Sequence, residues 1–258
     1  MYESLFSLEH KTVVITGGNG FLGSAIVRAL YDFGATVVIA DLEVKEQEKE
    51  DARIIGIRCD VSDTASIKAM FEETNNRCGG IDVLINCASY GAGYGKQGTI
   101  EQMSDEDWQK GIDGAAGTAF RCTREVVPYM EARGGGSIVN FGSMYGLVSP
   151  DPSIYGDSGA NNPANYGAGK AAVTQFTRYS AAHLAAKGIR VNSVSPGPFP
   201  NPHFQQDKQF HEELSKKTML KRVGKAEEMI GSILLLASGA SSYMTGTNIV
   251  VDGGWTAW

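Results

Sequence analysis

The chain has 258 residues, a hydrophobic content of 42% and a formal net charge of −6 at pH 7. This length can bury a large core, and we expect one domain spanning residues 1–258. The acidic balance and the lack of any Lys/Arg-rich run argue against nucleic acid as a partner. No run of about 18 apolar residues predicts a membrane span, and no apolar run of signal length opens the chain, so we expect a cytoplasmic protein.

The cysteines are widely spaced and form no C-x-x-C pair, so we expect reduced, mostly buried thiols with no disulfide framework and no zinc site. They are Cys59, Cys78, Cys87 and Cys122. His203 and His211 also lack partners at metal-ligand spacing. The sequence therefore predicts no metal.

Short β-branched runs alternate with longer amphipathic stretches along the whole chain. This alternation is typical of the α/β class, in which each strand is followed by a crossover helix. It predicts a single doubly wound domain, a seven-stranded parallel sheet with helices on both faces. The predicted strands are residues 12–16, 36–41, 53–58, 81–86, 136–141, 189–194 and 248–251.

The first predicted strand leads directly into a glycine-rich turn and then into an apolar-periodic helix. Read from Gly18 the turn is G-x-G-x-x-G, and read from Gly17 it is G-x-x-G-x-x-G. Such a turn alone is common and can be a simple helix entry, but between a strand and a helix it predicts a Rossmann-type dinucleotide site. The predicted contacts in the turn are Gly17, Asn19, Gly20, Phe21, Leu22 and Gly23.

The second predicted strand ends in a carboxylate at Asp41, eighteen residues past Gly23. A carboxylate there can accept hydrogen bonds from the adenosine ribose hydroxyls and repels a 2′-phosphate, so the sequence predicts NAD rather than NADP. We expect Leu42 beside it, and Asp60 and Val61 after the third strand, to meet the adenosine. The alternative is an ordinary solvated strand end.

Tyr166 and Lys170 lie four residues apart at the start of a predicted helix, so they share one helical face. A phenol with a pKa of about 10 needs a shift of about three units to act as an acid/base near pH 7, and a nearby ammonium favours the phenolate. Ser143 follows the fifth predicted strand, at the sheet edge where doubly wound folds bind ligands.

Together these motifs resemble the short-chain dehydrogenase/reductase (SDR) family, in its compact form, over essentially the whole chain. The glycine turn, Asn86-Cys-Ala88, Gly142-Ser143, Tyr166-x-x-x-Lys170, Pro196-Gly197 and Asp252-Gly-Gly254 occur in the family's order. The resemblance implies that Tyr166 is the acid/base, that Lys170 also binds the nicotinamide ribose and that Ser143 holds the substrate oxygen. It adds Asn86, Ala88, Pro196, Gly197 and Phe199 to the predicted cofactor contacts.

The sequence departs from the family pattern in several places. Ser143 and Tyr166 are 23 residues apart, farther than usual, and Tyr155 stands at the usual distance but has Gly159, not lysine, four residues later. We interpret residues 147–165 as holding an insertion whose polar side chains, Asp151, Tyr155, Asp157, Asn161, Asn162 and Asn165, could bind a hydroxyl-rich substrate or merely face solvent. We interpret residues 198–220 as a substrate lid. The family's relay asparagine is missing near Asp113 and Gly114, so either Asp113 or bound water would connect Lys170 to solvent.

The sequence therefore predicts an NAD(H)-dependent oxidoreductase that interconverts a secondary alcohol and a ketone on a small polar metabolite, such as a sugar, sugar acid or polyol. The alternatives are a 3-oxoacyl or steroid-type carbonyl reductase and a non-catalytic dinucleotide-binding protein. The resemblance implies a homotetramer or a homodimer, and the apolar tail with Trp255 and Trp258 would suit such an interface. The substrate, the reaction direction and the hydride face stay open.

Overall fold

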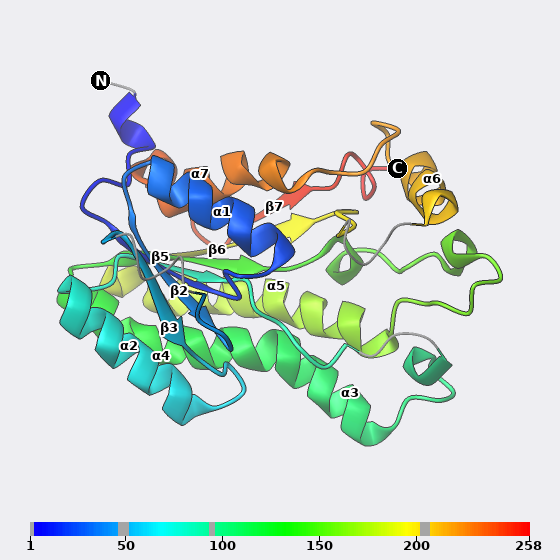
Figure 1. The fold of residues 1–258 in the computed structure, drawn as a ribbon, viewed down its shortest axis with the longest axis horizontal. Coiled ribbons are helices and arrows are strands. Elements are labelled where there is room, and N and C mark those ends of the chain that lie inside the picture. The colour runs from blue at the N-terminus through cyan, green and yellow to red at the C-terminus, as the bar shows by residue number, and fades with distance from the viewer. Residues whose placement is uncertain (1–2, 46–51, 93–95, 202–206) are drawn as a thin grey trace.

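Seven parallel strands form one sheet in the computed structural model, which describes residues 3–45, 52–92, 96–201 and 207–258 (Figure 1). The strand order is β3-β2-β1-β4-β5-β6-β7, so the chain begins near the centre and winds outward in both directions. This confirms the predicted doubly wound, Rossmann-type sheet. The strands are β1 (Thr12–Thr16), β2 (Thr36–Asp41), β3 (Ile54–Arg58), β4 (Val83–Asn86), β5 (Gly136–Phe141), β6 (Ile189–Pro196) and β7 (Asn248–Val251).

Helices cover both faces of the sheet. In Figure 1, α1 and α7 lie above it, and α2, α4 and α5 lie below it. Alternate residues of β1 belong to different cores: Val13 and Ile15 pack in the core that includes residues of α1 and α7, and Val14 packs in the core that includes residues of α2 and α4. The helices are α1 (Phe21–Asp32), α2 (Thr64–Cys78), α3 (Asp105–Ile112), α4 (Thr118–Ala132), α5 (Ala164–Leu184), α6 (Lys208–Lys217) and α7 (Ile230–Ala237).

Three strand ends differ from the predicted ones. β3 begins at Ile54 and β4 begins at Val83, slightly later than predicted. Asp82, just before β4, still contacts both neighbouring strands. Its backbone nitrogen donates to the Thr12 carbonyl oxygen at 3.0 Å, its carbonyl oxygen accepts from Ser137 N at 3.0 Å, and its carboxylate accepts from the Thr12 backbone nitrogen at 2.9 Å. β6 continues to Pro196, because its last residues pair with β7.

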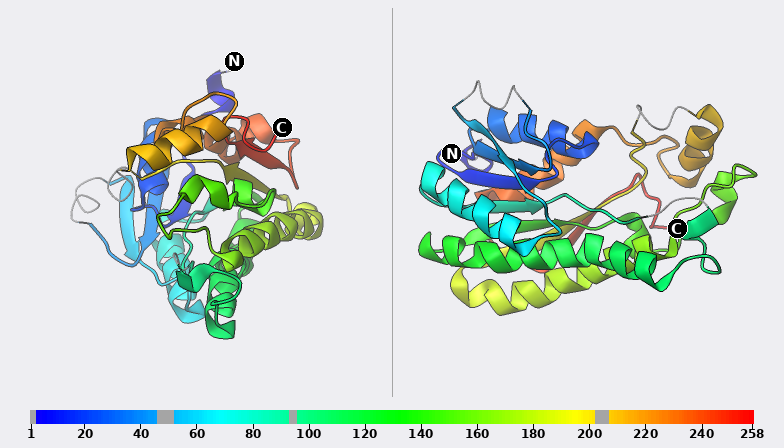
Figure 2. Two further views of the ribbon diagram at one scale, coloured as in Figure 1. Left: turned by 90° about the vertical axis from the view of Figure 1, so that its right-hand side faces the viewer. Right: turned by 60° about the horizontal axis from the view of Figure 1, so that its bottom comes forward.

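The carboxyl ends of the parallel strands meet at one edge, and the strand order reverses between β1 and β4. Such a switch point is where doubly wound sheets bind ligands. Figure 2 shows α6 at the same end of the molecule as the segment that follows β5. Within the described residues, no helix is long and apolar enough to cross a membrane, and no three His, Cys, Asp or Glu side chains are grouped as metal ligands.

Candidate active site

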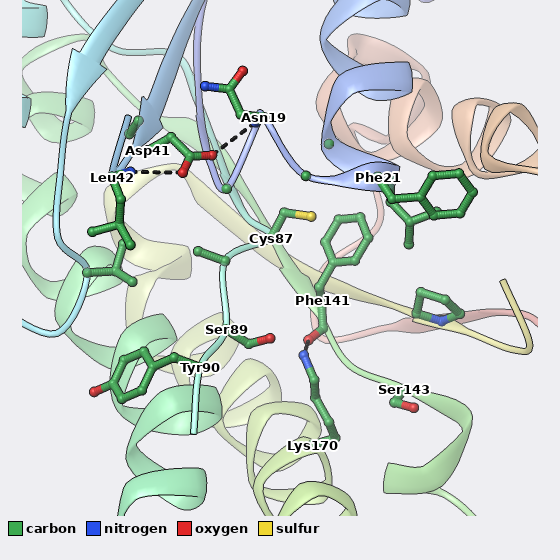
Figure 3. Close-up of a pocket in the computed structure, with 18 of the residues that line it drawn as sticks. Asn19, Phe21, Asp41, Leu42, Cys87, Ser89, Tyr90, Phe141, Ser143 and Lys170 are labelled. Carbon is green, nitrogen blue, oxygen red and sulfur yellow. Dashed lines mark hydrogen bonds between the residues drawn. The ribbon is translucent and has the colours of Figure 1, made fainter. Parts of the chain in front are cut away.

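A cavity of about 1000 Å³ opens at this edge of the sheet (Figure 3). It brings together segments that follow β1, β2, β3, β4, β5 and β6, together with the start of α5. The predicted residues that line it are Gly17, Asn19, Gly20, Phe21, Leu22, Gly23, Asp41, Leu42, Asp60, Val61, Ala88, Ser143, Tyr166, Lys170, Pro196, Gly197 and Phe199. Residues from both proposed halves of the site, nucleotide and catalytic, therefore share one cavity.

Asn86 is the predicted cofactor contact that does not line this cavity. Its side chain is buried, and its Nδ2 donates to Oδ1 of Asn140 at 2.8 Å and to Oγ1 of Thr123 at 3.4 Å. The side chain thus links β4 to β5 and α4. The residues just after it, Cys87 and Ala88, form the cavity wall instead.

The glycine turn places the first turn of α1 against the cavity. The backbone is tightly folded here, since a Cβ added at Gly23 would lie 2.3 Å from the carbonyl oxygen of Gly17. Any side chain at Gly23 would force the turn open. The turn therefore keeps the amino end of α1, with its unpaired amide groups, beside the cavity, an arrangement that suits a pyrophosphate.

Asp41 is fixed at the end of β2 by two backbone amides. One carboxylate oxygen accepts from Asn19 N at 3.0 Å and the other accepts from Leu42 N at 2.8 Å (Figure 3). Lys45 donates to the carbonyl oxygen of Asn19 at 3.5 Å, so one ammonium also lies near this turn. The carboxylate lines the cavity where the two strands β1 and β2 end.

Ser143, Tyr166 and Lys170 meet at the other end of the cavity. The hydroxyl groups of Tyr166 and Ser143 are hydrogen-bonded to each other. Lys170 lies one turn farther along α5, and its Nζ is 5.8 Å from the centroid of the Tyr166 ring. That ammonium is buried and donates to the carbonyl oxygen of Phe141 at 2.8 Å.

Burial controls the proton affinities of these groups. It lowers the pKa of Lys170 from 10.5 to about 8, because a charged ammonium loses water there. It also raises the pKa of the Tyr166 phenol, and the hydrogen bond with Ser143 offsets this only in part. The expectation that the ammonium leaves Tyr166 with a lowered pKa is therefore wrong for this structure, since burial outweighs it.

The insertion packs against α6 and does not line the cavity. The carboxylate of Asp151 forms an ion pair with Lys217 at 2.5 Å. The ring of Tyr155 stacks on Phe210 with centroids 5.5 Å apart. Tyr155, at the family's usual distance from Ser143, is thus outside the catalytic group, and none of the insertion's polar side chains named above lines the cavity.

Asn165 does not line the cavity either. It is fully buried, and its Nδ2 donates to the carbonyl oxygens of Asp107 at 2.7 Å and Gly91 at 3.3 Å. These bonds attach the start of α5 to α3. Of the predicted lid at 198–220, residues 202–206 lie outside the described residues, and α6 forms most of the rest.

The structure bears on one of the two sequence-based alternatives for the proton relay, the one through Asp113. Asp113 and Gly114 lie in a π-helical turn (Asp113–Gly117), and the Asp113 carboxylate is bound by Arg121 and Tyr90. The Asp113 carboxylate is therefore bound to Arg121 and Tyr90, which disfavours a proton relay through it. Sequence reasoning missed Tyr90, and also Cys87, Ser89, Lys110 and Asn201, which line the cavity. Their place directly after β4, or after Pro196-Gly197, was the signal that could have identified several of them.

Comparisons with known proteins agree with this geometry. A family model described as enoyl-(acyl carrier protein) reductase matches residues 19–256. The chain is 36% identical to a 3-oxoacyl-[acyl-carrier-protein] reductase of Thermotoga maritima, over 96% of this chain and 98% of that protein.

Two solved structures are similar throughout. A short-chain dehydrogenase from Leptospira borgpetersenii with bound NAD+ has a TM-score of 0.88 and 32% identity, covering 99% of this chain and 96% of that one. A gluconate 5-dehydrogenase from Burkholderia cenocepacia in complex with NADP and tartrate has a TM-score of 0.87 and 28% identity, covering 100% of both chains.

Proposed function

Since the chain belongs to the short-chain dehydrogenase/reductase family, an oxidoreductase family, we propose that it is an NAD(H)-dependent dehydrogenase of a small polar metabolite. It would interconvert a secondary alcohol and a ketone on a sugar, sugar acid or polyol. The observation that carries this proposal is one cavity lined by Ser143, Tyr166 and Lys170 together with the glycine turn and Asp41.

The residues present fit a nicotinamide dinucleotide. The amino end of α1 suits its pyrophosphate and the Asp41 carboxylate suits the ribose hydroxyls. When bound, the dinucleotide supplies the carbon that accepts or donates the hydride. In the oxidative direction Tyr166 would have to be deprotonated, and its phenolate would accept the proton of the substrate hydroxyl while the substrate carbon loses the hydride to the dinucleotide. In the reductive direction the neutral phenol would donate that proton, and Ser143 would hydrogen-bond the substrate oxygen in both directions. Lys170 would supply positive charge behind the phenol.

The preference for NAD(H) rests on Asp41. A 2′-phosphate would meet its fixed carboxylate, which accepts two backbone amides and already lines the cavity. The Leptospira structure contains NAD+, whereas the Burkholderia structure contains NADP, so relatives of similar fold use either cofactor. The negative charge of Asp41 favours NAD(H) over NADP(H).

A polar substrate is favoured by polar residues that line the cavity besides the predicted cofactor contacts, among them Ser89, Lys110 and Asn201. The gluconate 5-dehydrogenase, bound to tartrate, is a relative with a sugar-acid substrate. The similarity to a 3-oxoacyl reductase favours a second candidate, reduction of a 3-oxoacyl thioester. We further propose a cytoplasmic homotetramer or homodimer, as the family resemblance implies.

The experiment is an absorbance assay of the purified protein. NAD+ or NADP+ is mixed with a panel of sugar acids, polyols and sugars, and NADH or NADPH is mixed with a 3-oxoacyl thioester. We expect NADH to accumulate with at least one polar alcohol. Turnover only of the thioester, with NADPH, would replace the first proposal with the second. Absence of dinucleotide binding, measured by fluorescence of NADH and NADPH, would contradict both.

A further inference from the structure

Tyr90, just after β4, lines the cavity and is held there by an ion pair that the reaction does not use. Its hydroxyl donates to Oδ2 of Asp113 and accepts from Nη2 of Arg121 at 3.1 Å. Arg121 in turn binds both oxygens of Asp113, at 2.8 and 3.0 Å. A bidentate pair between a guanidinium and a carboxylate fixes the orientation of both groups. Because the Tyr90 hydroxyl bonds to both of them, the orientation of the Tyr90 side chain is fixed as well.

The same guanidinium reaches the loop after β3. Nε of Arg121 donates to the carbonyl oxygen of Val61 at 3.1 Å, and Val61 also lines the cavity. Three segments, the ends of β3 and β4 and the turn before α4, are thereby joined around one side of the cavity. Arg121 is largely buried, with a side-chain exposure of 14%, and it holds the pKa of Asp113 below its ordinary value.

The π-helical turn leaves room for this arrangement. The backbone nitrogen of Tyr90 donates to the carbonyl oxygen of Gly114 at 3.3 Å. A Cβ at Gly114 would lie 1.9 Å from the carbonyl oxygen of Tyr90, so a larger residue would displace the Tyr90 backbone. Wider turns of this kind are frequent at functional sites.

Figure 3 places Tyr90 on the side of the cavity that holds Asp41 and Leu42, away from Ser143. This is the side that the proposed function gives to the adenosine. Because the Tyr90 hydroxyl is already hydrogen-bonded to Asp113 and Arg121, we expect a ligand in the cavity to contact the Tyr90 ring. Flat aromatic rings bind nucleobases by stacking or edge contact, and a ring held in place loses little freedom on binding.

We propose that Tyr90 is a cofactor-binding residue whose ring packs against the adenine, and that Asp113 and Arg121 are positioning residues that hold the ring there. This inference rests on the proposed dinucleotide function and adds a binding residue to it. It also gives Asp113 a role in cofactor affinity in place of the expected proton relay.

The test measures binding of the two halves of the cofactor separately. Tyr90→Leu keeps apolar bulk without a flat ring, and Arg121→Met removes the guanidinium that holds the ring. Dissociation constants are measured for NADH, for ADP-ribose and for reduced nicotinamide mononucleotide. Tyr129→Leu is the matched control, because Tyr129 contacts Phe71 and does not line the cavity.

We expect Tyr90→Leu to weaken the binding of NADH and ADP-ribose by about 5- to 150-fold, the range of one base–aromatic stacking contact. The affinity for the mononucleotide should stay unchanged. Arg121→Met should raise KM for the cofactor and leave kcat at saturating cofactor unchanged, which a general loss of structure would not do. Tyr129→Leu should change neither constant.

The inference is overturned if folded Tyr90→Leu protein, with the parent's circular dichroism spectrum, binds ADP-ribose as tightly as the parent. An equal loss of mononucleotide affinity would overturn it too, since the damage would then be general. If Tyr90→Leu does not fold, Gly114→Ala decides in the same way, because the added Cβ displaces the Tyr90 backbone without removing the Tyr90 ring from the chain. If the parent protein binds neither NADH nor NADPH, the proposed function itself is contradicted.

Discussion

Lys170 donates from Nζ to the carbonyl oxygen of Phe141 at 2.8 Å, which joins α5 to the end of β5 directly before Ser143. The lysine is only 5% exposed and its pKa is lowered to about 8. Burying a charged ammonium lowers the free energy of unfolding of the protein. The burial of Lys170 in the proposed active site should therefore reduce stability by a measurable amount.

Lys170→Met should therefore stabilise the protein without cofactor. The shift from 10.5 to about 8 corresponds to about 3 kcal/mol, and the lost hydrogen bond to Phe141 offsets about 1 kcal/mol. At pH 7 the variant should be more stable by about 2 kcal/mol in urea unfolding.

The pH dependence of that difference has a definite sign. Between about 8 and 10.5 the unfolded chain holds a proton on Lys170 that the folded protein has released. The parent's free energy of unfolding therefore rises with pH across this window relative to the variant, and the gap narrows. Lys187→Met is the control for the loss of a lysine ammonium outside the cavity, because Lys187 pairs with Glu131 at 2.7 Å and does not line the cavity. A gap independent of pH would mean that the Lys170 ammonium is not destabilised by burial.

Tyr166→Phe should abolish turnover while leaving cofactor binding intact. The ring stays in place, but the hydroxyl that exchanges the proton and bonds Ser143 is gone. We expect kcat to fall by about 100-fold or more for Tyr166→Phe and by about 100-fold for Ser143→Ala. Tyr155→Phe is the matched control, because Tyr155 packs on Phe210 outside the cavity. Full turnover in Tyr166→Phe, or an equal loss in Tyr155→Phe, would contradict the assignment.

The sheet and the location of the cavity could be predicted because they depend on local patterns. β-branched runs such as Thr12–Thr16 bury both faces, and the glycines after them allow the tight turn from which α1 begins. Strand order then follows from the doubly wound connection, which places all ligand-facing residues at one edge. Helical spacing placed Tyr166 and Lys170 on one face of α5, and the resemblance to the family implied their roles.

The failures concern side chains whose partners are far away in sequence. Nothing near Asp113 or Tyr90 indicates that Arg121 will join them, and this contact decides what both can do. Likewise the polar composition of the insertion does not show that Tyr155 will stack on Phe210, 55 residues later. The pKa of Tyr166 was misjudged for a related reason, because burial depends on the assembled cavity and not on the spacing to Lys170.

Asp41→Ala should shift the cofactor preference toward NADP(H). The substitution removes the charge opposite a 2′-phosphate, and it leaves Lys45 near the turn. We expect the ratio of kcat/KM for NAD+ to that for NADP+ to fall by at least about 10-fold, which corresponds to about 1.4 kcal/mol. The control is Asp60→Ala, whose carboxylate bonds Ser62 at 2.8 Å and lies at the β3 end of the cavity. An unchanged ratio in Asp41→Ala would show that Asp41 does not select the cofactor.

The contact between the insertion and α6 should control how firmly that helix is held. Tyr155→Ala removes the ring that stacks on Phe210, and such pairs contribute about 0.5–1.5 kcal/mol. Amide hydrogen exchange in α6 should therefore accelerate by about 2- to 10-fold, and KM for the polar substrate should rise while KM for the cofactor stays constant. Tyr155→Phe keeps the ring and should preserve the exchange rate. Exchange in α6 at the parent rate in Tyr155→Ala would show that the ion pair between Asp151 and Lys217 holds the helix without help from the ring.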